Sequence, residues 1–253
     1  MLKTRLALLA LPLVLATSCA QHYELAGVER TRILIDDTFD KQPDTQAAQF
    51  IIPYKHTVDS LMNPVIGRAA CDLTPQRPEG TLSNLLPDIL IDASGTFGEK
   101  PDFAVYNMGG IRASLPKGDI TVGDILDVAP FENKICFLTL TGDKVQELFQ
   151  QMAGNGGEAV SHSVRMVITN DGKLVSAEVN GKPIDPKASY RIATLDYVAQ
   201  GNDRMVAFKA KTDVVSPKSE ENNVRHFIEK YFKKKMQEGQ AVSAKTEGRI
   251  TIK

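Results

Sequence analysis

The sequence predicts an α+β fold in a single domain, and three observations support that prediction. Of the 253 residues, 42% are hydrophobic and 24% are charged, which is enough apolar material for a core and little bias toward disorder. Before residue 155, apolar residues recur every three or four positions in several segments, as they do on the buried face of a helix. After residue 160, short apolar runs are separated by Asn-Asp-Gly and Asn-Gly, which are typical of the tight turns of β-hairpins.

The start of the chain has the pattern of an export signal. Residues 1–5 form a short basic segment. Residues 6–16 are apolar apart from one proline, and they are followed by small residues and Cys19. The apolar run is too short to span a bilayer as a helix. A cysteine in this position resembles the lipobox of bacterial lipoproteins, in which the cysteine becomes the lipidated first residue. An ordinary secretory signal with an incidental cysteine is the alternative.

The export signal divides the chain into three parts. We expect residues 1–18 to be a lipoprotein signal peptide, residues 19–42 a polar tether with an early strand at residues 32–35, and residues 43–253 the folded domain. No later segment reaches the roughly 18 apolar residues of a transmembrane helix. The prediction is an exported protein whose only membrane contact is its N-terminal lipid, on the periplasmic side or the surface of the bacterial envelope.

Helices and strands alternate in the first half of the predicted domain. Apolar residues at helical spacing predict a helix over residues 47–62, in which Pro53 introduces a kink or shifts the start. A second helical stripe covers residues 82–89 and also contains a proline, Pro87. The other elements expected here are strands at residues 65–69, 103–106 and 135–140, a short helix opening at residues 120–124, and a helix over residues 145–152.

Hairpins dominate the predicted second half. Two apolar runs, residues 164–169 and 174–179, flank an Asn-Asp-Gly turn, and Asn180-Gly181 marks another turn at which positive φ is favourable. The remaining expected elements are a strand at residues 190–195, a helix over residues 224–231 and a closing strand at residues 249–252.

Charge and the rarer residue types narrow the functional classes. The 30 Lys and Arg residues are balanced by 31 Asp and Glu residues, so the chain lacks the basic excess by which proteins hold a nucleic acid polymer. Four His and three Cys leave little material for a centre of several metal ions. Cys71 and Cys136 are an even pair in an exported chain, which permits a disulfide, but Cys136 in an apolar strand also fits a buried core thiol.

The first candidate binding loop follows the apolar strand at residues 103–106. Asn107 offers a paired hydrogen-bond donor and acceptor. Gly109 and Gly110 allow the backbone to approach a ligand closely, although a glycine pair after a strand is usually only a turn. Arg112 supplies a planar cation suited to carboxylate or phosphate.

Two further loops each contain an aromatic residue. Phe131 stands between a proline and two polar residues, and packing into the core is the alternative to ligand contact. Tyr197 follows the predicted strand at residues 190–195, and the carboxylate of Asp203 comes later in the same loop. Residues 201–203, Gly-Asn-Asp, are similar to the Gly-Asn-His-Asp motif of metallophosphatases but lack its histidine, so we do not interpret them as a metal site.

Taken in order, these loops resemble the C-terminal domain of 5'-nucleotidases. The shared motifs are Asn-x-Gly-Gly-Ile-Arg at residues 107–112, Pro-Phe at 130–131, and an aromatic residue with a Gly-x-Asp loop at 197–203. Further agreement lies at residues 63–67, 79–85 and 120–121. The resemblance spans roughly residues 45–215, most of the mature chain, and implies a single mixed α/β layered domain of the 5'-nucleotidase C-terminal type.

The resemblance also implies roles for the loop residues. In that family this domain holds the nucleoside, while a separate metallophosphatase domain with two metal ions hydrolyses the phosphate. By that resemblance, Phe131 and Tyr197 sandwich the base and Asn107 contacts the base edge. Asp203 holds the ribose hydroxyls, and Arg112 reaches the phosphate or ribose side.

The sequence departs from the family pattern at several positions. Tyr197 stands where the second aromatic residue is usually Phe. Residues 201–204 are Gly-Asn-Asp-Arg instead of the usual Gly-Gly-Asp-Gly, which makes the loop stiffer and more basic. For a further substrate-binding arginine of the family, the nearest counterpart is Arg77.

The metal-binding half of such an enzyme has no counterpart in the sequence. Few residues separate Cys19 from the first matching helix, and none of the four His lies in an Asp-x-His or His-x-His pair. We therefore expect no catalytic residue, metal site or cofactor in this chain, and divalent metals only on a partner. The predicted function is the nucleotide-recognition part of a split 5'-nucleotidase, a phosphoric monoester hydrolase, acting with a separately encoded metallophosphatase. A stand-alone nucleoside- or nucleotide-binding lipoprotein without catalysis is the alternative.

Overall fold

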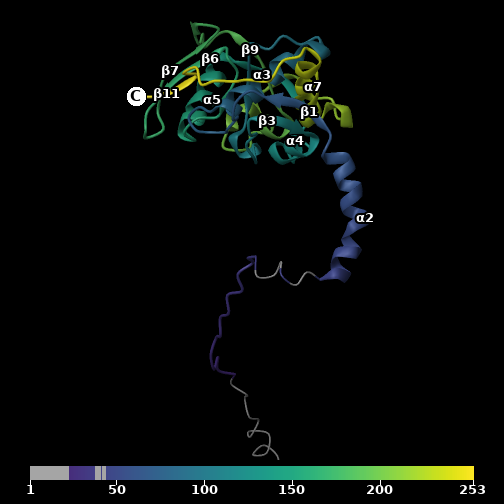
Figure 1. Cartoon of the computed structure of the whole chain (residues 1–253). Helices are drawn as coiled ribbons and strands as arrows, with labels where there is room; N and C mark the ends of the chain where they lie inside the picture. The colour runs from purple at the N-terminus through teal and green to yellow at the C-terminus, as the bar shows by residue number, and fades with distance from the viewer. Residues whose placement is uncertain (1–22, 38–40, 42–43) are drawn as a thin grey trace, which may run out of the picture. The chain divides into compact units, whose positions relative to one another are not determined.

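The computed structural model describes residues 23–37, 41 and 44–253. The predicted signal peptide and its lipidation site at Cys19 lie outside the described residues. The chain divides into two compact units, Met1–Phe50 and Ile51–Lys253. Figure 1 shows the order of helices and strands, and their mixture confirms the α+β class predicted from the sequence.

The early strand predicted at residues 32–35 is wrong, because these residues form neither a strand nor a helix. Their side chains are exposed, and the exposed fraction of Ile35 is 98%. A short apolar run becomes a stable strand only where a neighbouring strand takes up its backbone hydrogen bonds and a core covers one of its faces. Residues 32–35 have neither of these within the part of the chain that the structure describes.

Helix α2 (Thr45–Met62) confirms the helix predicted over residues 47–62. It starts where the carboxylate of Asp44 accepts hydrogen bonds from the backbone amides of Gln46 and Ala47, at 2.9 and 3.0 Å. Pro53 lies inside the helix and does not end it. No residue of α2 is buried, so its apolar stripe covers no core among the described residues.

A five-stranded sheet forms the core of the second unit. Its strands are β2 (Phe103–Tyr106), β4 (Ile135–Thr141), β5 (Ala159–Val160), β9 (Ser189–Leu195) and β10 (Thr212–Val215). Their order in the sheet is β10-β4-β9-β2-β5. Strands β2 and β9 are parallel, with Phe103 paired to Ile192. Strand β4 runs antiparallel to β9, with Ile135 opposite Leu195.

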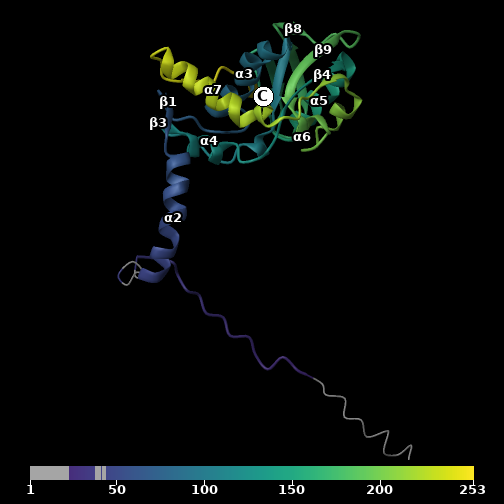
Figure 2. The same ribbon diagram turned by 90° about the vertical axis from the view of Figure 1, so that its right-hand side faces the viewer.

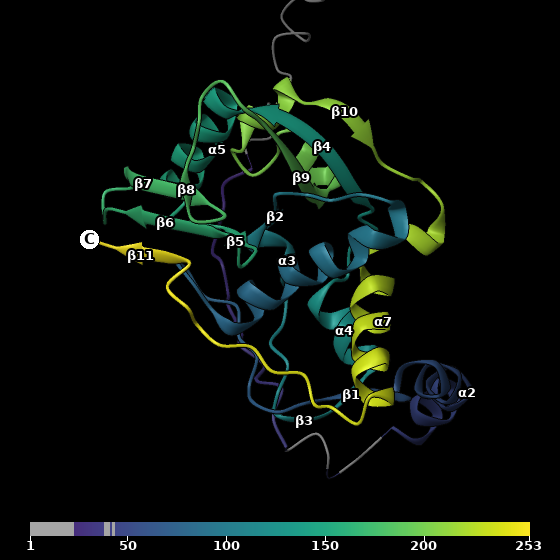
Figure 3. The ribbon, with the colours of Figure 1, turned by 90° about the horizontal axis from the view of Figure 1, so that it is seen from above.

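Helices cover both faces of this sheet. They are α3 (Thr81–Ser94), α5 (Gly142–Gly154) and α7 (Val224–Gln237). Figures 2 and 3 show α3 and α7 on one side of the sheet and α5 on the other. The ring of Phe103 packs on Phe149 of α5, with centroids 5.4 Å apart. On the other side, Phe97 packs on both Phe137 of β4 and Phe227 of α7. Burial on both faces explains why β2 and β4 are apolar without alternation, whereas the edge strand β10 is exposed.

Two smaller sheets complete the second unit. One contains β6 (Val164–Ile168), β7 (Leu174–Val179), β8 (Lys182–Pro183) and β11 (Ile250–Ile252), and the other pairs β1 (Val65–Ala69) with β3 (Gly118–Thr121). The predicted turn between β7 and β8 is confirmed, because Asn180 and Gly181 have φ angles of 54° and 70°. Strand β11 is the predicted closing strand and pairs in parallel with β6.

The remaining helical elements are short. They are α4 (Val122–Val128), α6 (Asp196–Ala199), and the 3₁₀ turns η2 (Gly95–Phe97), η3 (Met108–Gly110), η4 (Val206–Ala210) and η5 (Glu220–Asn222). Helix α4 begins at a capping box in which Thr121 and Asp124 bond each other's backbone amides. The sequence did not predict β3, β5, β10 or α6. Each has four residues or fewer, too few to establish a periodicity.

The structure also bears on the predicted absence of a transmembrane helix and on the possible disulfide between Cys71 and Cys136. Among the described residues, no helix is both long and apolar enough to cross a membrane. Cys71 and Cys136 are free thiols, so the structure does not contain the disulfide that their number permits. Cys136 is buried in β4, which fits the core-thiol alternative, and burial raises the pKa of its thiol.

Candidate functional site

Strand pairing brings three loops to one edge of the five-stranded sheet. Strands β2 and β9 are parallel neighbours, so the loops that follow them leave the sheet at the same edge. Strand β4 begins at Ile135, opposite Leu195, so the segment before β4 reaches this edge from the antiparallel direction. Asn107, Phe131 and Tyr197 come from these three loops and therefore lie close together.

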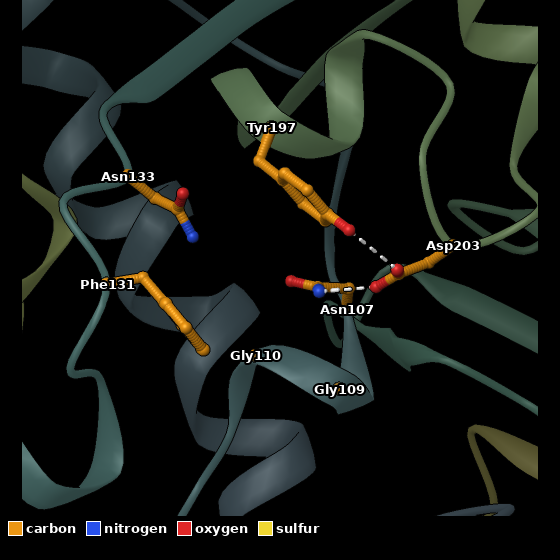
Figure 4. A pocket seen from close by; sticks show the side chains of 7 residues that line it. All are labelled: Asn107, Gly109, Gly110, Phe131, Asn133, Tyr197 and Asp203. Carbon is orange, nitrogen blue, oxygen red and sulfur yellow. Dashed lines mark hydrogen bonds between the residues drawn. The ribbon is translucent and has the colours of Figure 1, made fainter. Parts of the chain in front are cut away.

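A cavity of about 190 Å³ lies between the loops. Its lining residues are Asn107, Gly109, Gly110, Phe131, Asn133, Tyr197 and Asp203. Figure 4 shows the rings of Phe131 and Tyr197 on opposite sides of this space, with the amide groups of Asn107 and Asn133 pointing into it. We call it the aromatic cavity.

The two aromatic rings of this cavity are unusually open to solvent. The exposed fractions are 48% for Phe131 and 39% for Tyr197, so neither side chain packs into the core. For Phe131, this contradicts the alternative in which the ring is a core residue. Two rings that face one space offer apolar walls to a flat ligand.

Asp203 is the carboxylate of the aromatic cavity. One of its oxygens accepts a hydrogen bond from Asn107 Nδ2 at 2.5 Å, and the other accepts one from the hydroxyl of Tyr197 at 3.1 Å. Because the phenol donates to this carboxylate and lies beside its negative charge, the pKa of Tyr197 is raised. Asp203 therefore orients both an amide and an aromatic ring of the site.

Asn107 brings a buried hydrogen-bond acceptor to the aromatic cavity. The residue is only 3% exposed, and its Oδ1 has no hydrogen-bond partner among the described residues. A side chain at position 110 would place its Cβ 2.7 Å from this oxygen, so Gly110 is required there. An unpaired buried acceptor costs about 1–3 kcal/mol, and a donor from a ligand would remove that cost. Figure 4 shows the oxygen directed toward the space between the rings.

A second cavity, of about 360 Å³, adjoins the first and shares Gly109 and Asp203 with it. Its other lining residues are Arg77, Gly154, Asn155, Glu158 and Arg204. The guanidinium of Arg77 donates to Glu158 Oε1 at 2.9 Å. Burial raises the pKa of Glu158, against the lowering effect of the Met108 amide and of Arg77. We call this space the arginine cavity.

The sequence profile of the 5'-nucleotidase C-terminal domain matches residues 65–210, which is more than half of the chain. The chain belongs to the 5'-nucleotidase C-terminal domain family. The matched region includes every residue that lines the aromatic cavity and the arginine cavity. The resemblance predicted from the sequence is therefore confirmed.

Individual relatives agree with this assignment. Protein UshA of Yersinia enterocolitica is 33% identical over 153 residues, which cover 59% of this chain and 27% of the relative. The trifunctional nucleotide phosphoesterase protein YfkN of Bacillus subtilis is 28% identical over 237 residues, covering 85% of this chain and 16% of YfkN. The crystal structure of a 5'-nucleotidase precursor from Thermus thermophilus superposes with a TM-score of 0.70 at 29% identity, covering 83% of this chain and 43% of that one. The chain thus spans less than half the length of each relative.

Most predicted site residues of this 5'-nucleotidase-type domain meet in the structure. The aromatic cavity contains Asn107, Gly109, Gly110, Phe131, Tyr197 and Asp203, and the arginine cavity contains Arg77. Arg112 lines neither cavity. Its guanidinium is exposed and donates to the Gly109 carbonyl at 3.4 Å, so a contact to phosphate stays a prediction.

Sequence reasoning missed four polar residues that line the cavities. Asn133 lies two positions after Phe131, so the polar residues around that phenylalanine were a usable signal. Asn155 and Glu158 stand in a Gly-Asn-Gly-Gly-Glu segment that begins at the last residue of α5, a glycine-rich stretch of the kind already noted at residues 109–110. Arg204 was noticed only as a departure from the family pattern.

The donor set of the two cavities does not fit a pair of catalytic metal ions. Such a pair is held by several carboxylates and imidazoles, some of them bridging. Here Asp203 is bonded by Asn107 and Tyr197, and Glu158 is bonded by Arg77. Across the described residues, no group of three or more His, Cys, Asp or Glu side chains could hold a metal ion.

Proposed function

We propose that this domain binds the nucleoside part of a nucleotide and that a separately encoded metallophosphatase hydrolyses the phosphate ester. The observation that supports the proposal is the aromatic cavity. Two half-exposed rings border one space, and a carboxylate and two amides line it. A nucleoside is a flat heterocycle joined to a sugar with two vicinal hydroxyls, and it needs these kinds of contact.

The base would lie between Phe131 and Tyr197. Stacking on an aromatic side chain contributes about 1–3 kcal/mol per base and tolerates different bases. The unpaired Oδ1 of Asn107 would accept a hydrogen bond from the base edge. Asn133 lines the same cavity, and its amide can donate and accept there. These two asparagines would discriminate among bases.

The ribose would lie against Asp203. A carboxylate has about four acceptor sites, so it can receive two vicinal hydroxyls while keeping its present partners. Arg112 and Arg77 are the proposed contacts on the phosphate and ribose side, since a guanidinium binds phosphate with paired hydrogen bonds.

The side chains of the site position a substrate but supply no nucleophile. We assign phosphate hydrolysis, and the divalent metals that activate water for it, to the partner metallophosphatase. In this division of labour the present domain raises the partner's selectivity for nucleotides, because its contacts are to base and ribose.

A steady-state assay tests this division of labour. The purified protein is added to a metallophosphatase from the same organism that lacks a domain of this family. We expect kcat/KM for AMP to rise by about tenfold or more, the equivalent of one stacked base. The rate with 4-nitrophenyl phosphate should stay unchanged, because that ester has neither purine nor ribose.

The Phe131→Ala protein is the control, and it should fail to raise the rate with AMP. If the wild-type protein binds AMP and yet changes the kinetics of no exported metallophosphatase of the organism, the domain is a stand-alone nucleotide-binding protein. Hydrolysis of AMP by this chain alone, abolished by EDTA and retained through purification, would contradict the proposal.

We further propose that the protein is exported and anchored to the cell envelope through a lipid on Cys19. The lipobox-like segment before that cysteine supports the proposal. Labelled palmitate should enter the wild-type protein during growth but should not enter the Cys19→Ser protein. Equal labelling of both proteins would contradict the anchor.

A further inference from the structure

Glu158 is a buried carboxylate that the proposed function does not use. It is 2% exposed, in the segment between α5 and β5. Its two oxygens accept hydrogen bonds from three different parts of the chain: Met108, Arg77 and Asn155. A buried charge is retained only where such partners compensate its desolvation.

The first of these bonds fixes the loop that carries Asn107. The backbone amide of Met108 donates to Glu158 Oε2 at 2.7 Å. Met108 lies between Asn107 and the Gly109-Gly110 pair, so this bond sets the direction in which the loop leaves β2. A backbone amide bonded by a charged oxygen is held about twice as strongly as by a neutral one.

The second bond reaches the ribose side of the cavity through Asn155. Asn155 Nδ2 donates to Glu158 Oε1 at 3.1 Å and to the carbonyl oxygen of Asp203 at 2.9 Å. Asp203 has a φ of 53°, in the left-handed region, so its backbone needs support from outside. The third bond holds the Arg77 guanidinium on the same Oε1, at 2.9 Å.

We propose that Glu158 is a positioning residue of the nucleoside site. Its carboxylate joins the segments that carry Asn107, Asp203 and Arg77, and thereby keeps the base, ribose and phosphate contacts in one geometry. This inference rests on the proposed nucleoside-binding function of the aromatic cavity. Glu158 itself does not line that cavity and contacts no nucleoside there.

The test measures adenosine affinity by calorimetry for the wild-type protein and three variants. Glu158→Gln keeps the shape of the side chain, but its amide nitrogen cannot accept from Met108 or Arg77. Asn155→Ala removes the bonds of Asn155 to Glu158 and to the Asp203 carbonyl, and it leaves the bonds of Glu158 to Met108 and Arg77 in place. Glu99→Gln is the matched control, because Glu99 is also a mostly buried carboxylate. Its two oxygens accept hydrogen bonds from Nε and Nη2 of one guanidinium, that of Arg191. Arg191 lies near the start of β9, whereas the site lies beyond its end.

We expect Glu158→Gln to weaken adenosine binding about tenfold, as for the loss of one charge-assisted hydrogen bond, and Glu99→Gln to leave it unchanged. Asn155→Ala should weaken adenosine binding but should not affect 2',3'-dideoxyadenosine, which lacks the hydroxyls that Asp203 would hold. A merely structural role would lower both affinities together. If Glu158→Gln does not fold, the ligand difference in Asn155→Ala decides the question.

The outcomes separate this inference from the proposed function. If the wild-type protein binds adenosine and Glu158→Gln binds it equally well, the positioning role is overturned while the nucleoside site stands. If Asn155→Ala lowers both affinities equally, or if Glu99→Gln weakens adenosine binding as much as Glu158→Gln, the role is also overturned. If the wild-type protein binds no nucleoside, both the inference and the proposed function are wrong.

Discussion

Two consecutive residues beside the cavities, Asp203 and Arg204, have φ angles of 53° and 63°. The left-handed region costs most L-residues about 1–2 kcal/mol, and Asn and Asp tolerate it best. At Asp203 the side chain is held by Asn107 and Tyr197 and the carbonyl by Asn155. These bonds offset the backbone strain and orient the carboxylate toward the aromatic cavity.

Arg204 should be a site at which glycine stabilises the fold. Replacing Arg204 with Gly relieves the strain at a φ of 63°, whereas Arg204→Ala keeps a Cβ and therefore keeps the strain. We expect the free energy of unfolding of the Arg204→Gly protein to be about 1 kcal/mol higher than that of the Arg204→Ala protein. Urea denaturation of the two variants measures the difference. Equal stabilities would mean that the loop relaxes to another conformation.

The carboxylate of Asp203 should be specific for the ribose hydroxyls. Asp203→Asn preserves the size of the side chain, and Asn tolerates the left-handed backbone equally well. The amide is neutral and has one acceptor oxygen in place of two, so adenosine should bind about tenfold more weakly. The affinity for 2',3'-dideoxyadenosine should fall less, because that ligand has no hydroxyls to lose and is affected only through the bonds of Asp203 to Asn107 and Tyr197. A proportional loss for both ligands would place the ribose away from Asp203.

At the residue scale, the sequence predicted those site residues that form a family motif. Asn107, Phe131 and Tyr197 were found because each stands in a recognisable loop next to a strand. Glu158 was not found, because its partners Met108 and Arg77 lie 50 and 81 positions away in the chain. A buried hydrogen-bond network depends on the tertiary structure, and local sequence patterns do not contain it.

Among the helices and strands, the parallel pair β2 and β9 determines where the site forms. The apolar runs at residues 103–106 and 190–195 predicted both strands correctly, since each is buried between helices. Their pairing across a separation of nearly 90 residues was not predictable from either run alone. Strand β5 adds only two residues to the same sheet. A segment this short has no strand pattern of its own, and it is a strand because it pairs with β2.

The start of β9 depends on an ion pair that should make stability sensitive to acid. Both nitrogens on one edge of the Arg191 guanidinium donate to Glu99, at 2.7 and 2.6 Å. These hydrogen bonds hold the pKa of Glu99 below its ordinary value of 4.5. A carboxyl whose pKa is lowered by folding stabilises the protein above the unfolded pKa and loses this effect as the pH falls through the folded pKa.

We therefore expect Glu99→Gln to lower the unfolding free energy at pH 7 by about 1–3 kcal/mol. The difference from the wild-type protein should shrink as the pH falls from 4.5 through the lower folded pKa of Glu99. Urea denaturation of both proteins between pH 3 and 7 measures it. A difference that stays constant over this range would show that the ionisation of Glu99 is not coupled to folding.

For the whole molecule, the α+β class and the family were predictable because both depend on the order of elements and motifs. The short strands and α6 were not predictable from the sequence. The predicted strand at residues 32–35 was wrong because this apolar run resembles a strand in sequence but has no neighbouring strand among the described residues. The chain covers 27% of UshA from Yersinia enterocolitica and 43% of the Thermus thermophilus 5'-nucleotidase precursor. Its activity within a larger assembly is therefore a proposal, and ligand binding by the domain itself is the claim to test first.

Calorimetric titration of adenosine into the purified protein tests that claim most directly. We predict saturable binding to one site per chain, and a loss of about 1–3 kcal/mol of binding free energy in both Phe131→Ala and Tyr197→Ala. Tyr197→Phe, which keeps the ring, should lose less. Melting temperatures of the variants should stay close to that of the wild-type protein, since both side chains are half-exposed and lie outside the core. Absence of binding by adenosine, guanosine and uridine, or binding that neither alanine substitution weakens, would contradict the account.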